Sequence, residues 1–260
     1  MQHENTFTRK IKCMKTKMLL STLALASFAL MCSCSSNDPS TNTDNPNGIP
    51  IQNTAQAKVV LAGSSNFALL AGSAITSTGA TNITGDMGLS PGTSIGGFPP
   101  GIIVGTQQIN STLAIQAKLD LVAAYNDAAG RTSTDIVTLS GNIGGLTLTP
   151  GLYKTTSSLA ISSGDLTFDA KGNANAVFII QIASSLTTTS GRKVFLKGNA
   201  SASNIFWQVG SSATFGTTSV MKGQILAMQS ITFNTGATLN GCALARTGGI
   251  VLAGNTIVKE

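Results

Sequence analysis

Apolar and polar residues alternate in short runs after residue 55, and the runs end at Gly, Asn or hydroxylated residues. In each run the first and third residues tend to be apolar, while the second and fourth are small or hydroxylated. A period of two residues predicts β-strands that bury one face. Four runs align at offsets of 27, 27 and 18 residues, and a weaker fifth run follows; they lie at 159–162, 186–189, 213–216, 231–234 and 250–253.

Stacking these runs in register would place matching side chains in columns. Repeats that each cover the apolar face of a neighbour build a continuous core from few aromatic residues, as in a β-helix. We therefore predict a mainly β domain over residues 55–260, folded as a β-solenoid. The expected inward columns are Leu159, Leu186, Ala213, Ile231 and Ile161, Thr188, Phe215, Phe233; the outward columns are Ala160, Thr187, Thr214, Thr232 and Ser162, Thr189, Gly216, Asn234.

One segment departs from the strand pattern. Residues 111–128 contain no Gly or Pro, and their apolar residues follow helical spacing. We predict one amphipathic helix over about 111–129, lying along one side of the solenoid. Asn110 or Ser111 would cap its start and Gly130 its end. Two apolar sets define the predicted helix: Ile115, Leu119, Val122 and Leu121, Tyr125.

The N-terminal residues are typical of an export signal. A basic stretch at 9–17 precedes an almost wholly apolar run at 18–31, which is short for a membrane span. Cys34, preceded by the small Ser33, resembles the lipidated cysteine of a bacterial lipobox. We predict a signal peptide over 1–34 and a lipid anchor at Cys34, so that the protein is exported and held at the outer membrane or cell surface. The alternative is ordinary cleavage and secretion, and Met14 or Met18 is an alternative start.

Residues 35–54 are rich in Ser, Asn, Thr, Asp and Pro, with few apolar residues. Such a composition buries too little surface to order itself, so we predict a flexible tether. Beyond it the chain has one cysteine, Cys242, which excludes an intramolecular disulfide and predicts a buried thiol.

The formal charge of +6 arises mainly from the leader. From residue 35 onward there are 11 basic and nine acidic residues, so the balance gives no reason to expect a nucleic-acid partner. The single histidine is His3, which leaves the domain without a histidine triad or histidine metal site. We predict no enzyme activity, no cofactor and no metal. Asp165 and Asp169 are the one carboxylate pair considered for glycosidase chemistry, and turn aspartates that bind backbone groups are far commoner.

Several blocks resemble the ice-binding-like domain of bacterial and fungal antifreeze proteins. The blocks occur in the order and spacing of that family and together span about residues 55–258. They lie at 67–71, 83–91, 124–131, 144–153, 177–182, 204–209 and 223–227. The resemblance implies a discontinuous β-solenoid of triangular cross-section, with a long α-helix packed alongside and the N-terminal coil packed against later coils. Some members carry a capping subdomain before the helix; residues 96–110 are too few for one.

The resemblance also implies a binding site on a flat solenoid face and an ice crystal surface as the partner of a monomer. Two segments, 78–81 and 235–238, match the Thr-(Ala/Gly)-x-(Thr/Asn) repeats of some bacterial members. An outward threonine is commonly only a solvated strand residue, so the ordered column carries this prediction. The alternative function is a cell-surface adhesin or structural module that binds a glycan or a protein. The candidate ice-binding residues are Thr76, Thr78, Thr81, Thr187, Thr189, Thr214, Thr232, Asn234, Thr235 and Thr238.

Overall fold

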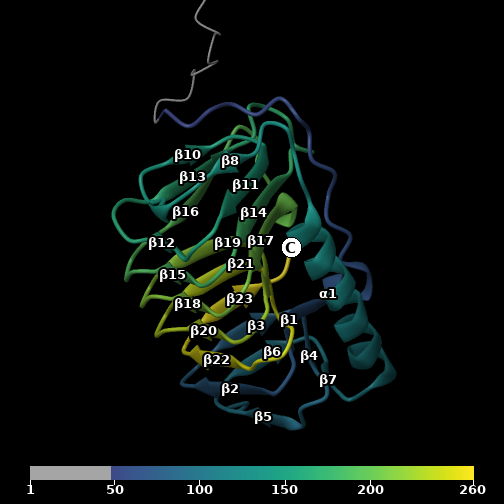
Figure 1. Ribbon diagram of the computed structural model, residues 1–260. Coiled ribbons are helices and arrows are strands. Elements are labelled where there is room, and N and C mark those ends of the chain that lie inside the picture. Colours follow the sequence, from purple (N-terminus) through teal and green to yellow (C-terminus); the bar gives the residue numbers. More distant parts are fainter. Residues whose placement is uncertain (1–47) are drawn as a thin grey trace, which may run out of the picture. The chain divides into compact units, whose positions relative to one another are not determined.

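The computed structural model describes residues 48–260. This part of the chain is a stack of short parallel strands that form three faces around an apolar interior, with one long helix beside it (Figure 1). The mainly β solenoid with one α-helix, as predicted, is confirmed. The predicted leader and Cys34 lie outside the described residues. No helix within residues 48–260 has both the length and the apolarity to cross a membrane.

The first face carries the helix. Its strands, in spatial order, are paired side by side. They are β8 (Val137–Thr138), β11 (Gly151–Thr155), β14 (Phe178–Ile182), β17 (Ile205–Val209), the second halves of β19 (Val220–Ala227) and β21 (Thr238–Ala245), then β1 (Phe67–Ala71), β4 (Asp86–Leu89) and β7 (Gln107–Ile109). The inner strands have nearly all of their residues buried, whereas the strand that ends the face beyond β4 has none.

The second face is a separate eight-stranded sheet that no helix covers. Its register is the one that the sequence repeats predict: Leu159 lies beside Leu186, then Ala213, Ile231 and Ile250. The strands are β9 (Gly141–Asn142), β12 (Leu159–Ile161), β15 (Leu186–Thr188), β18 (Ala213–Phe215), β20 (Ile231–Phe233), β22 (Ile250–Ala253), β2 (Ala74–Thr78) and β5 (Ser94–Gly96).

The third face contains the remaining strands. The long strands β19 and β21 belong to two faces, because each bends around a corner at a glycine with positive φ, Gly223 and Gly241. The members of this face are β10 (Thr147–Leu148), β13 (Leu166–Asp169), β16 (Val194–Lys197), the first halves of β19 and β21, then β23 (Thr256–Val258), β3 (Asn82–Thr84) and β6 (Ile102–Val104).

The order of coils differs from the order of the chain. The N-terminal strands β1, β2 and β3 pair with the C-terminal strands β21, β22 and β23. The helix then carries the chain to the opposite end of the solenoid, from which later coils return to the first ones (Figure 1). This confirms a discontinuous solenoid. Residues 96–110 supply β6 and β7 of the outermost coil and contain no separate subdomain.

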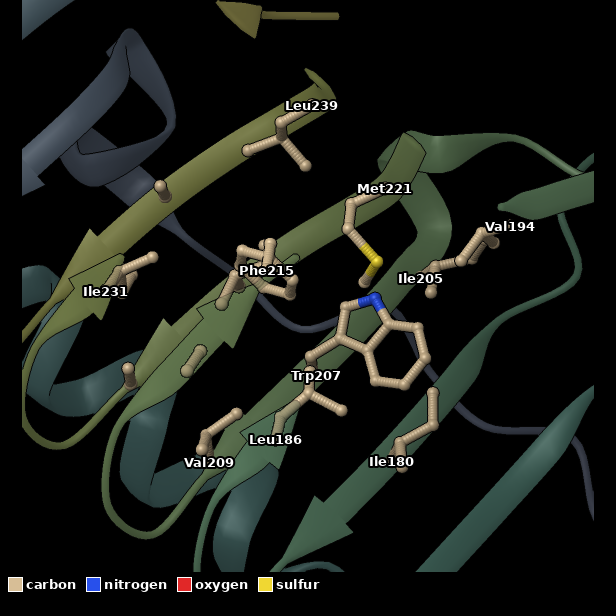
Figure 2. Close-up of a cluster of buried hydrophobic side chains, with 14 of the residues drawn as sticks. Ile180, Leu186, Val194, Ile205, Trp207, Val209, Phe215, Met221, Ile231 and Leu239 are labelled. Atoms are coloured by element: carbon tan, nitrogen blue, oxygen red, sulfur yellow. The ribbon is translucent and has the colours of Figure 1, made fainter. Parts of the chain in front are cut away.

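Apolar side chains from all three faces fill the solenoid. Trp207 is fully buried and packs edge-on against Phe168 with ring centroids 5.6 Å apart. Its indole nitrogen donates to the carbonyl oxygen of Lys222 at 2.9 Å, which satisfies the one polar atom of the ring. Figure 2 shows Met221 and Ile180 beside this indole, in the same apolar layer.

The helix α1 spans Thr112–Gly130, close to its predicted bounds. The hydroxyl of Ser111 accepts from the amide of Ala114 at 3.1 Å, so the predicted N-terminal cap is confirmed. The predicted C-terminal cap is wrong: Gly130 is still helical and does not have positive φ. Instead, the side-chain amide of Gln181 donates to the carbonyl oxygens of Ala128, Ala129 and Arg131 at the helix end.

The predicted buried face of the helix is only half right. Leu121 and Tyr125 are buried against the first face, together with small alanines. Ile115 and Leu119, however, are 46% and 61% exposed. Alanines let the helix lie close to the sheet, whereas the larger side chains of the other set point to solvent. Helical spacing alone does not distinguish these two apolar stripes.

The predicted boundary of the tether is also wrong. Residues 48–61 form a strap along the domain, and a short 3-10 helix, η1 (Ala62–Asn66), follows. Gln52 is buried and accepts from the amide of Leu152 at 2.8 Å. The carboxylate of Asp135 accepts from Ser133 and from the amides of Thr54 and Asn53, and these bonds hold its pKa below the usual range. Specific hydrogen bonds thus order a segment whose composition alone predicts disorder.

A second short 3-10 helix, η2 (Ala202–Asn204), precedes β17.

Candidate functional site

The second face presents a line of hydroxylated side chains to solvent. We call this eight-stranded sheet the threonine face. Its central outward line follows the backbone register from strand to strand, and three successive members are threonines. From one end to the other the line contains Asn142, Ala160, Thr187, Thr214, Thr232, Val251, Thr76 and Gly96.

Two further outward lines border the central one. Thr189 and Asn234 follow the ends of β15 and β20, and Thr78 ends β2. The hydroxyl of Thr189 donates to the carbonyl oxygen of Ser162 at 3.1 Å, which fixes its side chain against the next coil. On the other border, which the predictions omitted, lie Ser158, Ser185, Ser212 and Ser230. Extending the alternation one residue before each run would have found this line.

The inner side of the same strands makes the sheet rigid. Leu186, Ala213 and Ile231 are fully buried beneath the face. The rings of Phe215 and Phe233 pack at a tilt of 37°, with centroids 4.8 Å apart. Thr188 points inward, as predicted, and its hydroxyl accepts from the amide of Gly216 at 2.9 Å. The outward side chains therefore stand on a close-packed floor.

The threonine face has no charge. None of its eight strands contains Asp, Glu, Lys, Arg or His. The charged residues of the described chain lie on the other two faces, the helix, the strap and the turns. The face also has no titratable group of any other kind, so its surface chemistry consists of hydroxyls, methyls and amides.

Three of the ten candidate residues do not belong to this surface. Thr81 is fully buried: Ser77 donates to its hydroxyl at 2.7 Å, so the prediction that it contacts a ligand is wrong. The hydroxyl also accepts a hydrogen bond from the backbone amide of Asn255, so Thr81 stabilises the fold at this corner. Thr235 lies in the exposed turn after β20, and Thr238 lies on the third face in β21. The other seven lie together on the threonine face or at the ends of its strands.

The two carboxylates considered for glycosidase chemistry have structural partners. Asp165 accepts from the amide of Lys193 and Asp169 from the amide of Lys171, each at 2.9 Å. Within residues 48–260, no three His, Cys, Asp or Glu side chains are placed to hold a metal ion. Cys242 is buried, as predicted, and burial raises the pKa of its thiol to about 12.

Two small hollows lie away from the threonine face. One, of about 390 Å³, lies beside the start of the helix and is lined in part by Asp86 and Lys259. The other, of about 380 Å³, lies under the strap and reaches Gln224 and Cys242.

Comparison with known proteins finds relatives of this chain. The sequence profile of the ice-binding-like family matches residues 69–258. An ice-binding protein of Nostoc sp. (strain HG1) is 44% identical over 200 residues, which cover 76% of this chain and 73% of the relative. An ice-binding protein of Flavobacterium frigoris (strain PS1) is 35% identical over 239 residues, covering 85% and 83%. The crystal structure of an ice-binding protein from an Antarctic biological consortium superposes with a TM-score of 0.80 at 67% identity, covering 81% of this chain and 95% of that one.

Proposed function

The chain belongs to the ice-binding-like family, and we propose that it adsorbs to ice crystals through the threonine face. The observation that carries the proposal is the unbroken ladder register from Thr187 through Thr214 to Thr232, with Thr76 two strands further on. The shared name of the relatives supports ice binding over an adhesin or structural module. No catalytic role is proposed.

The spacing of the strands gives the face its selectivity for a lattice. Neighbouring strands in a sheet lie about 4.7–4.9 Å apart, and the same side chain recurs at that interval along the threonine line. Such an interval is close to the repeat distances of ice. Hydroxyl groups hydrogen-bond to water at regular positions, while the methyl groups between them confine water without binding it. The face thus orders a layer of water that can merge with a crystal.

Rigidity and lack of charge favour adsorption. Because the outward side chains stand on a packed floor of Leu186, Ala213 and Phe215, little conformational freedom is lost on contact. Contacts through ordered water are nearly as favourable as direct hydrogen bonds. An ammonium or carboxylate would instead orient its own hydration shell, so the absence of charge leaves the ordered water free to match ice.

Adsorption accounts for effects on ice growth. Protein molecules bound at intervals force the ice to advance as curved fronts between them, and a curved front melts at a lower temperature than a flat one. The expected activities are therefore thermal hysteresis and inhibition of ice recrystallisation. Since the face is a rigid surface of a single chain, a monomer suffices for both.

Bulky substitutions on the threonine line test the proposal. Thr214→Tyr and Thr232→Tyr place rings above the flat face and hold it away from ice, so we expect thermal hysteresis to fall severalfold in each purified variant. Thr256→Tyr, at an exposed position on the third face, is the matched control and keeps full activity. Circular dichroism checks that each variant is folded. Equal activity in all three variants, or no activity in the folded wild-type protein, would refute ice adsorption through this face.

We propose further that the protein is exported and that Cys34 carries a lipid, which would let it attach a cell to ice. The support is the basic and apolar leader followed by Ser33-Cys34. Growth of the host with radiolabelled palmitate tests this: label is expected in the wild-type protein and not in Cys34→Ala. Release of unlabelled wild-type protein into the medium would indicate ordinary secretion instead.

A further inference from the structure

Phe195 is an unusual residue of the third face. Its side chain is 46% exposed, and it is the one aromatic residue of 48–260 that is exposed to this degree. Phe98 is half-buried, and all the other aromatic side chains in that range are buried. An exposed aromatic ring on a rigid sheet is a common mark of a binding surface.

Lysines surround this ring. Lys193 and Lys197 are two positions away on either side in the same strand segment, so they point to the same side of the sheet, each about 7 Å from Phe195 along the chain. The backbone of Lys193 forms a β-bridge with Val220, and Lys222 follows two residues later on that neighbouring strand, β19. Thr167 lies beside Phe195 on the other strand. We call these five residues the Phe195 patch.

The lysines of the patch have no acidic partner. Asp165 pairs with Arg192 at 3.7 Å and Asp169 with Lys171 at 3.4 Å. Lys193, Lys197 and Lys222 form no ion pair with any of the residues that the structure describes. Residues 48–260 hold 11 lysines and arginines and seven aspartates and glutamates, a formal excess of four. Asp169 lies beside Lys197 on the adjacent strand and Asp165 borders Lys193, but with Arg192 and Lys171 the five basic groups of this region outnumber its two carboxylates, so the region is net positive.

We propose that the Phe195 patch binds an acidic polysaccharide. The C–H face of a sugar ring would stack on Phe195, and carboxylate or sulfate groups of the same polymer would pair with the three lysines. Thr167 offers a hydroxyl to the sugar hydroxyls in the same line of side chains. The ligand class follows from this combination of one apolar ring, a hydroxyl and unpaired ammonium groups on a flat surface.

Two other anionic partners fit the patch less well. A lipid surface favours several apolar side chains gathered together, yet the exposed Val258 and Val104 of this face lie on β23 and β6, beyond β19 and β21. Nucleic acid bound with useful affinity typically has roughly six to ten phosphates neutralised. Three lysines and one ring fall short of that, whereas a polyuronate with one charge per sugar needs only a few contacts.

The patch lies on a different face from the threonine line, so it is independent of the proposed contact with ice. A molecule that uses both surfaces would be retained in an acidic extracellular gel while its threonine face contacts the crystal. Loss of one activity leaves the other measurable, and the two proposals can fail separately.

Affinity electrophoresis of the purified protein tests the inference. The native gels contain sodium alginate, a polyuronate, or dextran, a neutral glucan, at low salt. We expect alginate and not dextran to retard the wild-type protein. Phe195→Ala and the double variant Lys193→Gln/Lys222→Gln should each weaken the apparent affinity about tenfold. Lys58→Gln/Lys154→Gln, which removes two exposed lysines outside the patch, is the charge-matched control and should bind as the wild type does.

Thermal hysteresis, measured on the same samples, should be equal in all variants and shows that each is folded. The proposal is overturned if alginate does not retard the wild-type protein, or if Phe195→Ala binds as well as the wild type. It is also overturned if both double variants lose affinity equally, because the binding would then depend only on total charge. Tighter binding to oligothymidine or to phosphatidylglycerol vesicles than to alginate would reject the polysaccharide in favour of that partner.

Discussion

Val251 interrupts the line of threonines between Thr232 and Thr76. Its side chain is 44% exposed and stands at the same register position as its neighbours. Valine matches threonine in shape but offers no hydroxyl, so one anchoring point for ordered water is lost at this strand. The line therefore works as two segments, and the longer one contains Thr187, Thr214 and Thr232.

Joining these two segments should increase activity. Val251→Thr adds the missing hydroxyl without a change of shape, and we expect higher thermal hysteresis at equal protein concentration. Val258→Thr makes the same substitution at an exposed position of the third face, and its activity should equal that of the wild type. If Val251→Thr leaves hysteresis unchanged, then regular hydroxyls are not what limits adsorption.

Lys118, on the helix α1, makes the free energy of unfolding of the domain depend on pH. Its ammonium group is buried under α1 and donates to the carbonyl oxygens of Ala245 and Arg246, each at 2.6 Å. Burial, and then the positive charge of Arg246, lower its pKa from 10.5 to about 8. In the unfolded chain the group keeps its ordinary pKa, so between these values the folded state binds fewer protons than the unfolded state. Stability from this residue accordingly rises as the pH rises through 8.

Comparison with Lys118→Met isolates this contribution, since burial also raises the pKa of Cys242 and Tyr153, which acts in the opposite direction. We expect the free energy of unfolding of the wild type, relative to the variant, to increase by about 1 kcal/mol between pH 7 and pH 9. Urea denaturation at the two pH values measures it. A difference that stays constant or decreases with pH would show that the ammonium group is not destabilised by its burial.

At the scale of elements, the corners decide how strands pass from one face to the next. Gly241 has a φ of +138°, and a Cβ there would overlap the carbonyl oxygen of Gly223 on the adjacent strand. A side chain at this position would need both an unfavourable backbone conformation and a displaced neighbour. The corner thus allows β21 to serve two faces without a break.

Gly241→Ala should therefore destabilise the domain by about 3 kcal/mol. Gly96→Ala is the control, because a Cβ at Gly96 meets no atom within 4 Å; it should change stability by less than about 0.5 kcal/mol. Chemical denaturation measures both. Equal stability of the two variants would mean that the corner relaxes readily and that its glycine is dispensable.

Strand register was the most predictable property of the elements. The alternation around Leu159, Leu186, Ala213 and Ile231 determines which side of each strand is buried, and a slip of one residue would expose the whole apolar set. The helix was predictable in length for a similar reason, but its orientation was not. Leu121 and Leu119 have the same hydrophobicity. Leu121 is buried because the alanines on its side of the helix let that side lie close to the sheet.

The candidate site was predictable in part. Threonines inside aligned strands, such as Thr187 and Thr214, were located by their period, whereas Thr81, Thr235 and Thr238 of the Thr-Gly-Ala-Thr segments were not. Thr81 and Thr238 follow a turn, and the turn carries the chain around a corner to another direction. The hydrogen bonds that order Gln52 and Asn53 depend on Leu152 and Asp135, which are distant in sequence, so composition gave the opposite prediction for the strap.

For the whole molecule, the three faces have separate tasks. The helix and strap cover one face and stabilise it, the threonine face is bare, rigid and uncharged, and the third face holds the excess of positive charge. Because each property is confined to one face, substitutions on the threonine line or in the Phe195 patch should leave the interior intact. The solenoid is in this sense a support whose surfaces can change independently.

The pairing of the first coils with the last has a consequence for how the chain reaches this structure. Strands β1, β2 and β3 pair on one edge with the nearby β4, β5 and β6, but the partners of their other edges, β21, β22 and β23, lie about 170 residues later in the chain. Contacts of such long range make folding slow, because the loop between them must close before they contribute. The solenoid therefore cannot be completed in chain order during synthesis, and one edge of the first coil stays without its partner strands until the last strands have emerged.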